Sequence, residues 1–145
     1  MNHVINRQVH EIFELYSKAK NRQEKIKVLK SHENVNALRD VVRGIFDDTI
    51  QWNLPGGEPP YVENNPDTSP STLLKQHMKF KYFVKGLKES ESMMKFKREK
   101  LFIDILESIH PEDAKILVSM INKKNPVKGL TKKIVQEAYP NLIQK

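Results

Sequence analysis

The sequence contains no cysteine, and this absence excludes disulfide bonds, thiolate metal sites and a cysteine nucleophile. It also contains no apolar run that approaches the roughly 18 residues of a membrane-spanning helix. The first residues, MNHVINRQVHEIF, lack the uninterrupted apolar segment and the small-residue cleavage site of a secretory signal. We therefore expect a protein that is neither secreted nor embedded in a membrane.

Catalytic patterns are missing as well. The sequence pairs no nucleophile with a base, has no metal-ligand spacing, and contains no phosphate-binding loop. Its GGEPP segment has no following Gly-Lys-Ser/Thr, and its prolines remove backbone donors that a phosphate cradle needs. The segment His-Pro-Glu-Asp at residues 110–113 is explained by helix capping. We expect no enzyme activity, no cofactor and no metal site, although a site assembled from distant segments around His77 or His110 stays an open alternative.

The charge is unevenly distributed. The net charge is +7 over 145 residues, which is about the length of one domain. Residues 1–48 contribute +2, residues 49–70 contribute −3, and residues 71–145 contribute +8. A basic half is typical of proteins that bind a polyanion, because lysine and arginine gain affinity by releasing phosphate counterions. A lysine-rich surface that serves solubility alone is an equally good interpretation.

Residues 49–70 are predicted to form a long central loop. The segment holds the only tryptophan, Trp52, five of the eight prolines, and no lysine or arginine. Because it also contains Trp52 and Tyr61, we expect it to be pinned to the helices rather than disordered. We predict an intramolecular clamp, with a protein-binding surface as the alternative, since tryptophan and tyrosine are frequent interface anchors. The residues of that surface are Trp52, Pro55, Pro59, Pro60 and Tyr61.

Apolar residues before this loop recur at helical spacing: Val9, Ile12, Phe13, Tyr16, Leu38, Val41, Val42 and Ile45. The first four predict a helix over residues 4–19. Asn21 followed by Glu24 has the pattern of a capping box that opens a second helix. Asn34 is the expected N-cap of a third helix.

Helical spacing returns after the loop at Leu73, His77, Phe80, Val84, Leu87, Leu101, Phe102, Ile105, Leu106, Ile109, Ala114, Leu117, Met120 and Ile121. We expect one helix to begin at Ser69 and Pro70, another at Pro111 and a last one capped by Thr131. Residues 86–94 are polar and are expected to form a loop. The sequence thus predicts an all-α single domain of six to seven helices around a long Pro-rich central loop.

Two groups of lysines are candidates for nucleic-acid binding. The main group precedes and opens the last helix, where cations oppose the helix dipole and therefore suggest a bound anion: Lys123, Lys124, Lys128, Lys132 and Lys133. A second patch consists of Lys75 and Lys79, in the segment KQHMKFKYFVKGLK. Basic and aromatic residues alternate there, as in proteins that bind single strands. Because Phe80 is needed in the core, this single-strand interpretation is weakened.

Four segments carry a family resemblance: FDDTIQWNLPGGEPPY, PSTLLKQHMKFKYFVKG, REKLFIDILESIHPEDAKIL and KGLTKKIVQEAYPNLI. From about Glu11 to Ile143, the chain resembles a family of small uncharacterised proteins of T-even-like tailed bacteriophages, especially marine and cyanobacterial ones. The resemblance implies a phage-encoded protein that acts in the cytoplasm of an infected host or is carried in the virion. It assigns no catalytic or binding residues. Our leading hypothesis is a non-enzymatic accessory protein that binds nucleic acid, or a nucleic-acid-handling complex, through its basic C-terminal half. The alternative is a virion component or host-protein inhibitor that uses the Trp52–Tyr61 loop.

Overall fold

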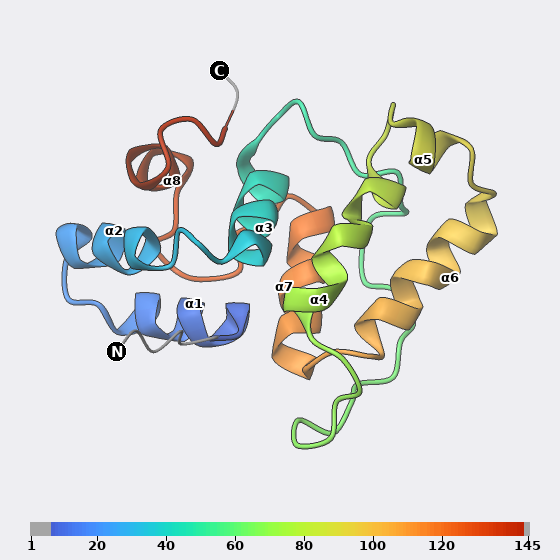
Figure 1. The fold of residues 1–145 in the computed structure, drawn as a ribbon, viewed down its shortest axis with the longest axis horizontal. Helices are drawn as coiled ribbons and strands as arrows, with labels where there is room; N and C mark the ends of the chain where they lie inside the picture. Colours follow the sequence, from blue (N-terminus) through green and yellow to red (C-terminus); the bar gives the residue numbers. More distant parts are fainter. Residues whose placement is uncertain (1–6, 144–145) are drawn as a thin grey trace.

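The computed structural model describes residues 7–143 and is all-α (Figure 1). Within these residues lie eight α-helices and one 3₁₀ helix, η1, and no strand. The expectation of six to seven helices is too low, because it left out the one-turn helix inside residues 86–94. In chain order the elements are α1 (Val9–Lys18), α2 (Arg22–Ser31), α3 (Asn36–Phe46), α4 (Leu73–Gln76), η1 (His77–Phe83), α5 (Lys88–Glu91), α6 (Lys95–Leu106), α7 (Pro111–Ile121) and α8 (Lys132–Ala138).

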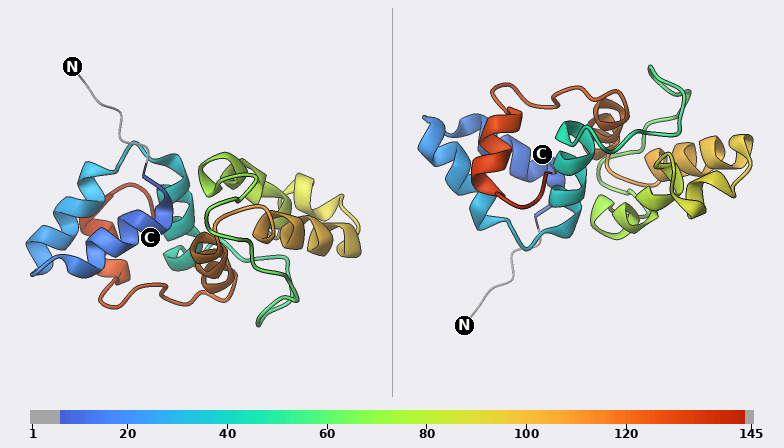
Figure 2. Two further views of the ribbon diagram at one scale, coloured as in Figure 1. Left: turned by 90° about the horizontal axis from the view of Figure 1, so that it is seen from below. Right: turned by 90° about the horizontal axis from the view of Figure 1, so that it is seen from above.

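The helices form two groups on either side of a central pair. Helices α3 and α7 pack against each other in the middle of the molecule. On one side, α2 packs against α8 and against α1, and on the other side lie α4, η1, α5 and α6 (Figure 2). Across the part of the chain that the structure describes, every helix falls short of the length and apolarity that a bilayer crossing requires.

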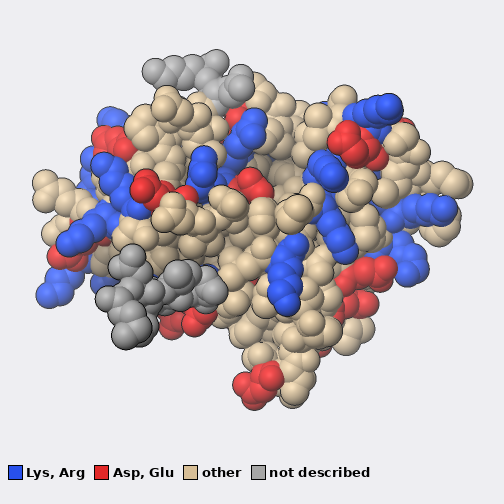
Figure 3. Space-filling view, in the orientation of Figure 1, with Lys and Arg blue, Asp and Glu red and all other residues tan. Residues whose placement is uncertain are grey.

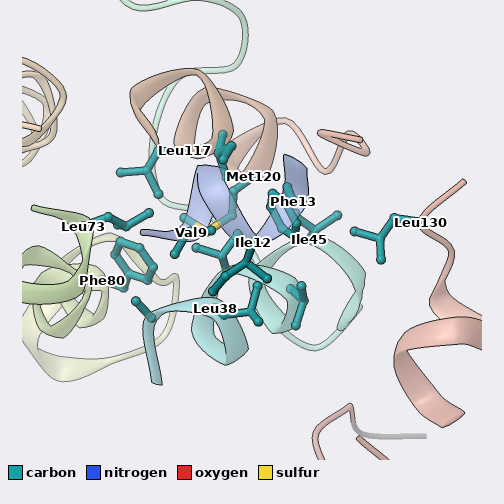
Figure 4. Packing of buried hydrophobic residues seen from close by; sticks show 14 of the residues in the cluster. Val9, Ile12, Phe13, Leu38, Ile45, Leu73, Phe80, Leu117, Met120 and Leu130 are labelled. Carbon is teal, nitrogen blue, oxygen red and sulfur yellow. The ribbon is translucent and has the colours of Figure 1, made fainter. Parts of the chain in front are cut away.

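The core lies where α1, α3, α4 and α7 meet (Figure 4). Fully buried side chains there include Ile12, Leu38, Leu73 and Leu117. Each such side chain stabilises the fold by about 1.5–3 kcal/mol relative to its exposed state. The buried stripe predicted for α3 is confirmed, since its four residues are at most 4 % exposed.

The N-terminal helix boundaries differ from prediction by one or more residues. Helix α1 starts at Val9, so residues 7 and 8 precede it, and residues 4–6 lie outside the described residues. The cap of α2 is confirmed, because Asn21 Oδ1 accepts a hydrogen bond from the Glu24 backbone at 2.9 Å. Helix α3 has Val35 as its N-cap, without a side-chain cap bond, and the prediction of Asn34 is wrong.

The prediction of a helix that begins at Ser69 and Pro70 is wrong about both the first residue and the type of helix. Helix α4 starts only at residue 73 and gives way after one turn to η1. A 3₁₀ helix has three residues per turn, so side chains three apart lie on one face. Phe80 and Phe83 are accordingly both buried. Met78 is 72 % exposed, and Leu87, which was expected on the buried face, is 41 % exposed.

Residues 47–72 connect α3 to α4 without a helix and run along the outside of α6 and α7 (Figure 1). The Gly57 N–H donates to Asn122 Oδ1 at 2.7 Å, and Asn122 Nδ2 donates back to the Gly57 carbonyl at 2.9 Å. Farther along, the Val62 N–H donates to Glu107 Oε2 at 2.8 Å. These bonds hold the segment on the helices at several separate points.

Trp52 lies at the start of this segment and joins the central helix α3 to η1. Its ring is 8 % exposed, and its Nε1 donates to the Gly44 carbonyl of α3 at 3.0 Å. The ring also packs edge-on against Phe80 of η1, with centroids 6.0 Å apart. An isolated antiparallel bridge pairs Trp52 with Val84. The segment therefore fixes η1 relative to α3.

The predicted starts of the last two helices are confirmed. Pro111 occupies the first turn of α7, and the preceding His110 acts as N-cap by accepting a hydrogen bond from the Glu112 backbone at 3.0 Å. Thr131 caps α8, since its Oγ1 accepts from the Ile134 backbone at 3.2 Å.

Candidate nucleic-acid interface

Most of the net charge gathers in one part of the fold. Residues 71–100, which span α4, η1, α5 and the first half of α6, contain nine Lys and Arg and three Glu. We call this segment the basic lobe. Its net charge of +6 compares with +7 for the whole chain. The surplus of the C-terminal half therefore comes mainly from this lobe, and less from the lysines around the last helix.

Eight lysines of the basic lobe have exposed side chains: Lys75, Lys79, Lys81, Lys85, Lys88, Lys95, Lys97 and Lys100. Figure 3 shows basic side chains spread over the part of the surface formed by α4 and α6. Within residues 7–143, Lys100 alone among the eight approaches a carboxylate, with Nζ 3.2 Å from Asp104 Oδ2. The remaining seven ammonium groups are available to an external anion.

The ninth cation of the lobe, Arg98, holds the lobe together. Its side chain is buried, with 8 % exposure. Its Nε donates to the Asn53 carbonyl at 2.7 Å, and its Nη1 donates to the carbonyls of Ser90 and Met93 at 3.0 Å each. Hydrogen bonds from a charged donor are stronger than neutral ones. Arg98 thus ties α6 to α5 and to the 47–72 segment, and gives the surrounding lysines a fixed framework.

A groove of about 620 Å³ lies between the C-terminal half of α3 and η1. We call it the α3–η1 groove. Its walls combine three cationic side chains, Arg43, Lys81 and Lys85, with six apolar ones: Ile50, Trp52, Met78, Phe80, Val84 and Leu87. Two further lining residues pair with each other, since His77 Nδ1 lies 2.6 Å from Asp40 Oδ2. The groove therefore has a positive rim and an apolar wall, and its one lining carboxylate has a partner within the protein.

The five lysines around the last helix are not all available to an external anion, because two of them contact groups within the protein. Lys123 Nζ donates to the Asp47 carbonyl at 2.9 Å, and Lys132 Nζ lies 3.2 Å from Asp48 Oδ2. Burial lowers the pKa of Lys123 from its ordinary value of 10.5, against the raising effect of both aspartates. The other three side chains are exposed: Lys124, Lys128 and Lys133.

The direction in which the Lys123 side chain points is set by the backbone conformation at the C-terminal end of α7. Lys123 has φ of 55°, in the left-handed region that a helix often uses just past its last turn. Its N–H bonds to the Met120 carbonyl, and the Lys124 N–H bonds to the Ser119 carbonyl. This pair of bonds is the Schellman arrangement. It turns the chain so that the Lys123 side chain reaches the residues that follow α3.

The five residues proposed for a protein-binding loop differ in how far their side chains are exposed. Trp52 is buried, Pro59 and Tyr61 are half-buried, and Pro55 and Pro60 are exposed. Burial, followed by the nearby carboxylates, raises the pKa of the Tyr61 hydroxyl above its ordinary 10.0. The Trp52 ring holds the position that an intramolecular clamp requires.

Sequence reasoning missed three exposed apolar side chains in the basic lobe. Met78, Met94 and Phe96 are 72 %, 62 % and 62 % exposed. The signal for Phe96 was present, because it stands between Lys95 and Lys97 and the residues three and four positions after it, Glu99 and Lys100, are charged.

The histidines pair with acidic groups in two separate places. His77 pairs with Asp40. His10 stacks on His110 with ring centroids 4.0 Å apart, and its Nδ1 lies 3.0 Å from Oδ1 of the fully buried Asp113. Burial alone would lower the pKa of His10, but the hydrogen bonding and charge of Asp113 outweigh burial, and the pKa is raised above 6.5. Among residues 7–143, no group of three or more potential ligands is placed to hold a metal ion.

The model of one protein family, DUF6433, matches residues 12–126. The matched range includes the 47–72 segment and the whole basic lobe, and it ends before α8. No curated protein matches the sequence. The match spans well over half of the 145 residues. The chain therefore belongs to DUF6433, a family of unknown function.

Proposed function

We propose that the protein binds nucleic acid without a catalytic step, and that the basic lobe is its principal contact surface. The observation that carries the proposal is the net charge of +6 on residues 71–100, with seven exposed lysines that have no carboxylate partner among residues 7–143. Each lysine that meets a phosphate releases a condensed counterion and adds to affinity. An extended basic surface on several elements suits a polyanion better than a small ligand.

The distribution of the acidic residues favours this function over a merely soluble surface. Surfaces that serve solubility intersperse both signs of charge. Residues 1–48 do so, with nine basic and seven acidic side chains, whereas the basic lobe has nine and three. The excess in the lobe is therefore local, and it produces a positive field that attracts a polyanion.

The lysines around the last helix extend this surface in our proposal, but with a smaller share than the sequence suggested. Lys123 and Lys132 already bind groups within the protein. Lys124, Lys128 and Lys133 stay exposed. We assign these three an auxiliary role.

A protein-binding role for the Trp52–Tyr61 loop is the alternative. What weighs against it is the buried Trp52 ring, which would have to leave its hydrogen bond with Gly44 to reach a partner. The resemblance to proteins of T-even-like phages suggests, as part of this proposal, that the nucleic acid is met in the cytoplasm of an infected bacterium or in the virion. Both contain abundant DNA or RNA.

The test is the affinity for labelled duplex DNA, single-stranded DNA and RNA, measured by fluorescence anisotropy over a series of salt concentrations. We expect binding that weakens steeply with salt, with a slope of about −3 to −4 for duplex DNA if about four phosphates are neutralised. Lys79→Glu/Lys97→Glu should reduce the magnitude of the slope by about 2, since each lysine contributes about one unit.

Two matched double reversals serve as comparisons. Lys27→Glu/Lys30→Glu changes two exposed lysines of α2 and shifts the net charge equally, so it should leave most of the affinity in place. Lys124→Glu/Lys133→Glu should have an intermediate effect. Equal losses for all three variants would show that only net charge matters and would refute the assignment to the lobe. No binding at low salt would refute the function itself.

A further inference from the structure

We propose that the α3–η1 groove receives an unpaired base of a single-stranded nucleic acid, with the neighbouring phosphates on Arg43, Lys81 and Lys85. The inference rests on the proposed nucleic-acid function and deepens it, because it assigns a place and a strand form to the contact. Non-specific single-strand binding combines a positive groove along the backbone with apolar or aromatic surface for the bases.

The groove has the size and lining that a base requires. Its volume is about 620 Å³, within the range of roughly 300–1,000 Å³ typical of sites that enclose a small organic group. Met78 and Leu87, at 72 % and 41 % exposed, place apolar surface on its wall and leave it open to solvent. Exposed apolar side chains of this size gain by burial against the face of a base.

The charges around the groove favour an anion, because three cationic side chains line it against one carboxylate. Lys81 and Lys85 are exposed and lie four residues apart at the end of η1. Arg43 enters from α3, where its Nε lies 3.4 Å from Asp47 Oδ2. Asp40, the acidic lining residue, pairs with His77. The phosphates on the two sides of the bound base can therefore each contact a cationic side chain.

A duplex cannot present a base in this way, because its bases are stacked and paired inside the helix. A single strand can rotate one base away from its neighbours at low cost. The structure also holds the groove ready, since the Trp52 ring and the Trp52–Val84 bridge fix η1 against α3. The groove thus predicts a preference for single strands over duplexes, which charge alone does not produce.

Trp52 supplies a local reporter. It is the only tryptophan of the chain, and it is one of the residues that line the groove. A base that enters should change its fluorescence. The experiment titrates the full-length protein with three probes of equal length: a mixed-sequence single-stranded DNA, the corresponding duplex, and a strand in which every nucleotide is an abasic site.

We expect the single strand to bind roughly tenfold more tightly than the duplex, from stacking of a single base, and to change the Trp52 fluorescence. The abasic strand keeps the phosphates but should bind like the duplex, with no change in fluorescence. Lys81→Ala/Lys85→Ala and Met78→Asp, all at exposed positions, should remove the preference for the single strand. The matched Lys75→Ala/Lys79→Ala variant, in α4 and η1 but outside the groove, should weaken all probes alike and keep that preference.

Each contrary result has a distinct meaning. If the abasic strand binds as well as the single strand and changes Trp52 equally, no base enters the groove, and the inference fails while the proposed function stands. A poly-glutamate peptide of equal charge that reproduces the fluorescence change would make the groove a site for acidic protein segments and would also overturn the inference. Absence of binding to all three DNA probes at low salt would overturn the inference and the proposed function together. Circular dichroism of each variant separates loss of binding from loss of fold.

Discussion

Replacing Gly44 with alanine tests the contact that joins α3 to the 47–72 segment and, through Trp52, to η1. A Cβ atom at this position of α3 would lie 2.5 Å from Trp52 Cζ2 and 2.9 Å from Met120 Sδ. Methionine is flexible and can adjust. The Trp52 ring cannot move away without lengthening the 3.0 Å bond from its Nε1 to the Gly44 carbonyl. The Trp52 ring can thus pack directly on α3 because residue 44 is a glycine and has no side chain.

The expected effect is the balance of three contributions. Alanine in place of glycine would by itself stabilise a helix by about 1 kcal/mol. Overpacking against a buried ring costs about 1–3 kcal/mol, and loss of the indole hydrogen bond costs about 1 kcal/mol more. We expect Gly44→Ala to lower the free energy of unfolding by about 2 kcal/mol. For a domain of this size, that corresponds to a fall in Tm of about 6 °C.

A double-mutant cycle isolates the contact. Urea unfolding followed by the helical circular dichroism signal applies to all variants, including those without tryptophan. Trp52→Phe should destabilise the protein on its own, and Gly44→Ala should cost much less in that background, because the smaller ring leaves room for the methyl group. We expect a coupling energy of at least about 1 kcal/mol. If Gly44→Ala is as stable as the parent, or if the two effects simply add, the Trp52 ring does not rest on Gly44.

Two further substitutions probe other buried polar contacts. His10→Gln should destabilise the fold more at about pH 5.5 than at about pH 8.5, because Asp113 raises the folded-state pKa of His10. The protonated ring contributes its full stabilisation of the fold below the pKa of His10 in the unfolded chain. This contribution is lost as the pH rises through the folded-state pKa. Urea unfolding at both pH values checks this, and equal losses at the two would contradict it. Arg98→Met keeps much of the side-chain volume but leaves three backbone carbonyls without their charged donor, so we expect a loss of about 3 kcal/mol. Hydrogen exchange should then quicken in residues 51–56 and 88–94 before α7, and uniform exchange across the chain would argue against a local tie.

The parts of the fold that sequence reasoning predicted are those decided by local rules. The buried stripe of α3 follows from the 3.6-residue repeat, and its residues are buried as expected. The starts of α7 and α8 follow from Pro111 and Thr131. A proline lacks the backbone N–H that would have no partner in a first helical turn, and a threonine before the helix accepts a hydrogen bond from one of the remaining N–H groups. These features need no knowledge of what the helix packs against.

The errors occur where distant contacts override the local pattern. Residues 77–83 read as an α-helix, but the bridge between Trp52 and Val84 draws the chain into an extended form at the end of η1. The tighter 3₁₀ repeat then buries Phe83 together with Phe80. The groove beside η1 was unpredictable for the same reason, since its walls come from α3, the 47–72 segment and η1. Nothing in the sequence near Lys81 indicates that Arg43 lies across from it.

The separation of charge in the molecule has an energetic consequence for the proposed function. The central loop carries three acidic side chains, Glu58, Glu63 and Asp67, all exposed, and among residues 7–143 none of them forms an ion pair with a lysine of the basic lobe. The segment is held by other bonds, such as those between Gly57 and Asn122 and the one from the Val62 N–H to Glu107. Self-repulsion among unneutralised lysines opposes the compact state, so an arrangement selected for stability alone would bring these carboxylates next to the lobe. A protein that keeps them apart retains a positive field for an external polyanion, and bound nucleic acid should therefore raise its Tm by an amount that falls as salt is added.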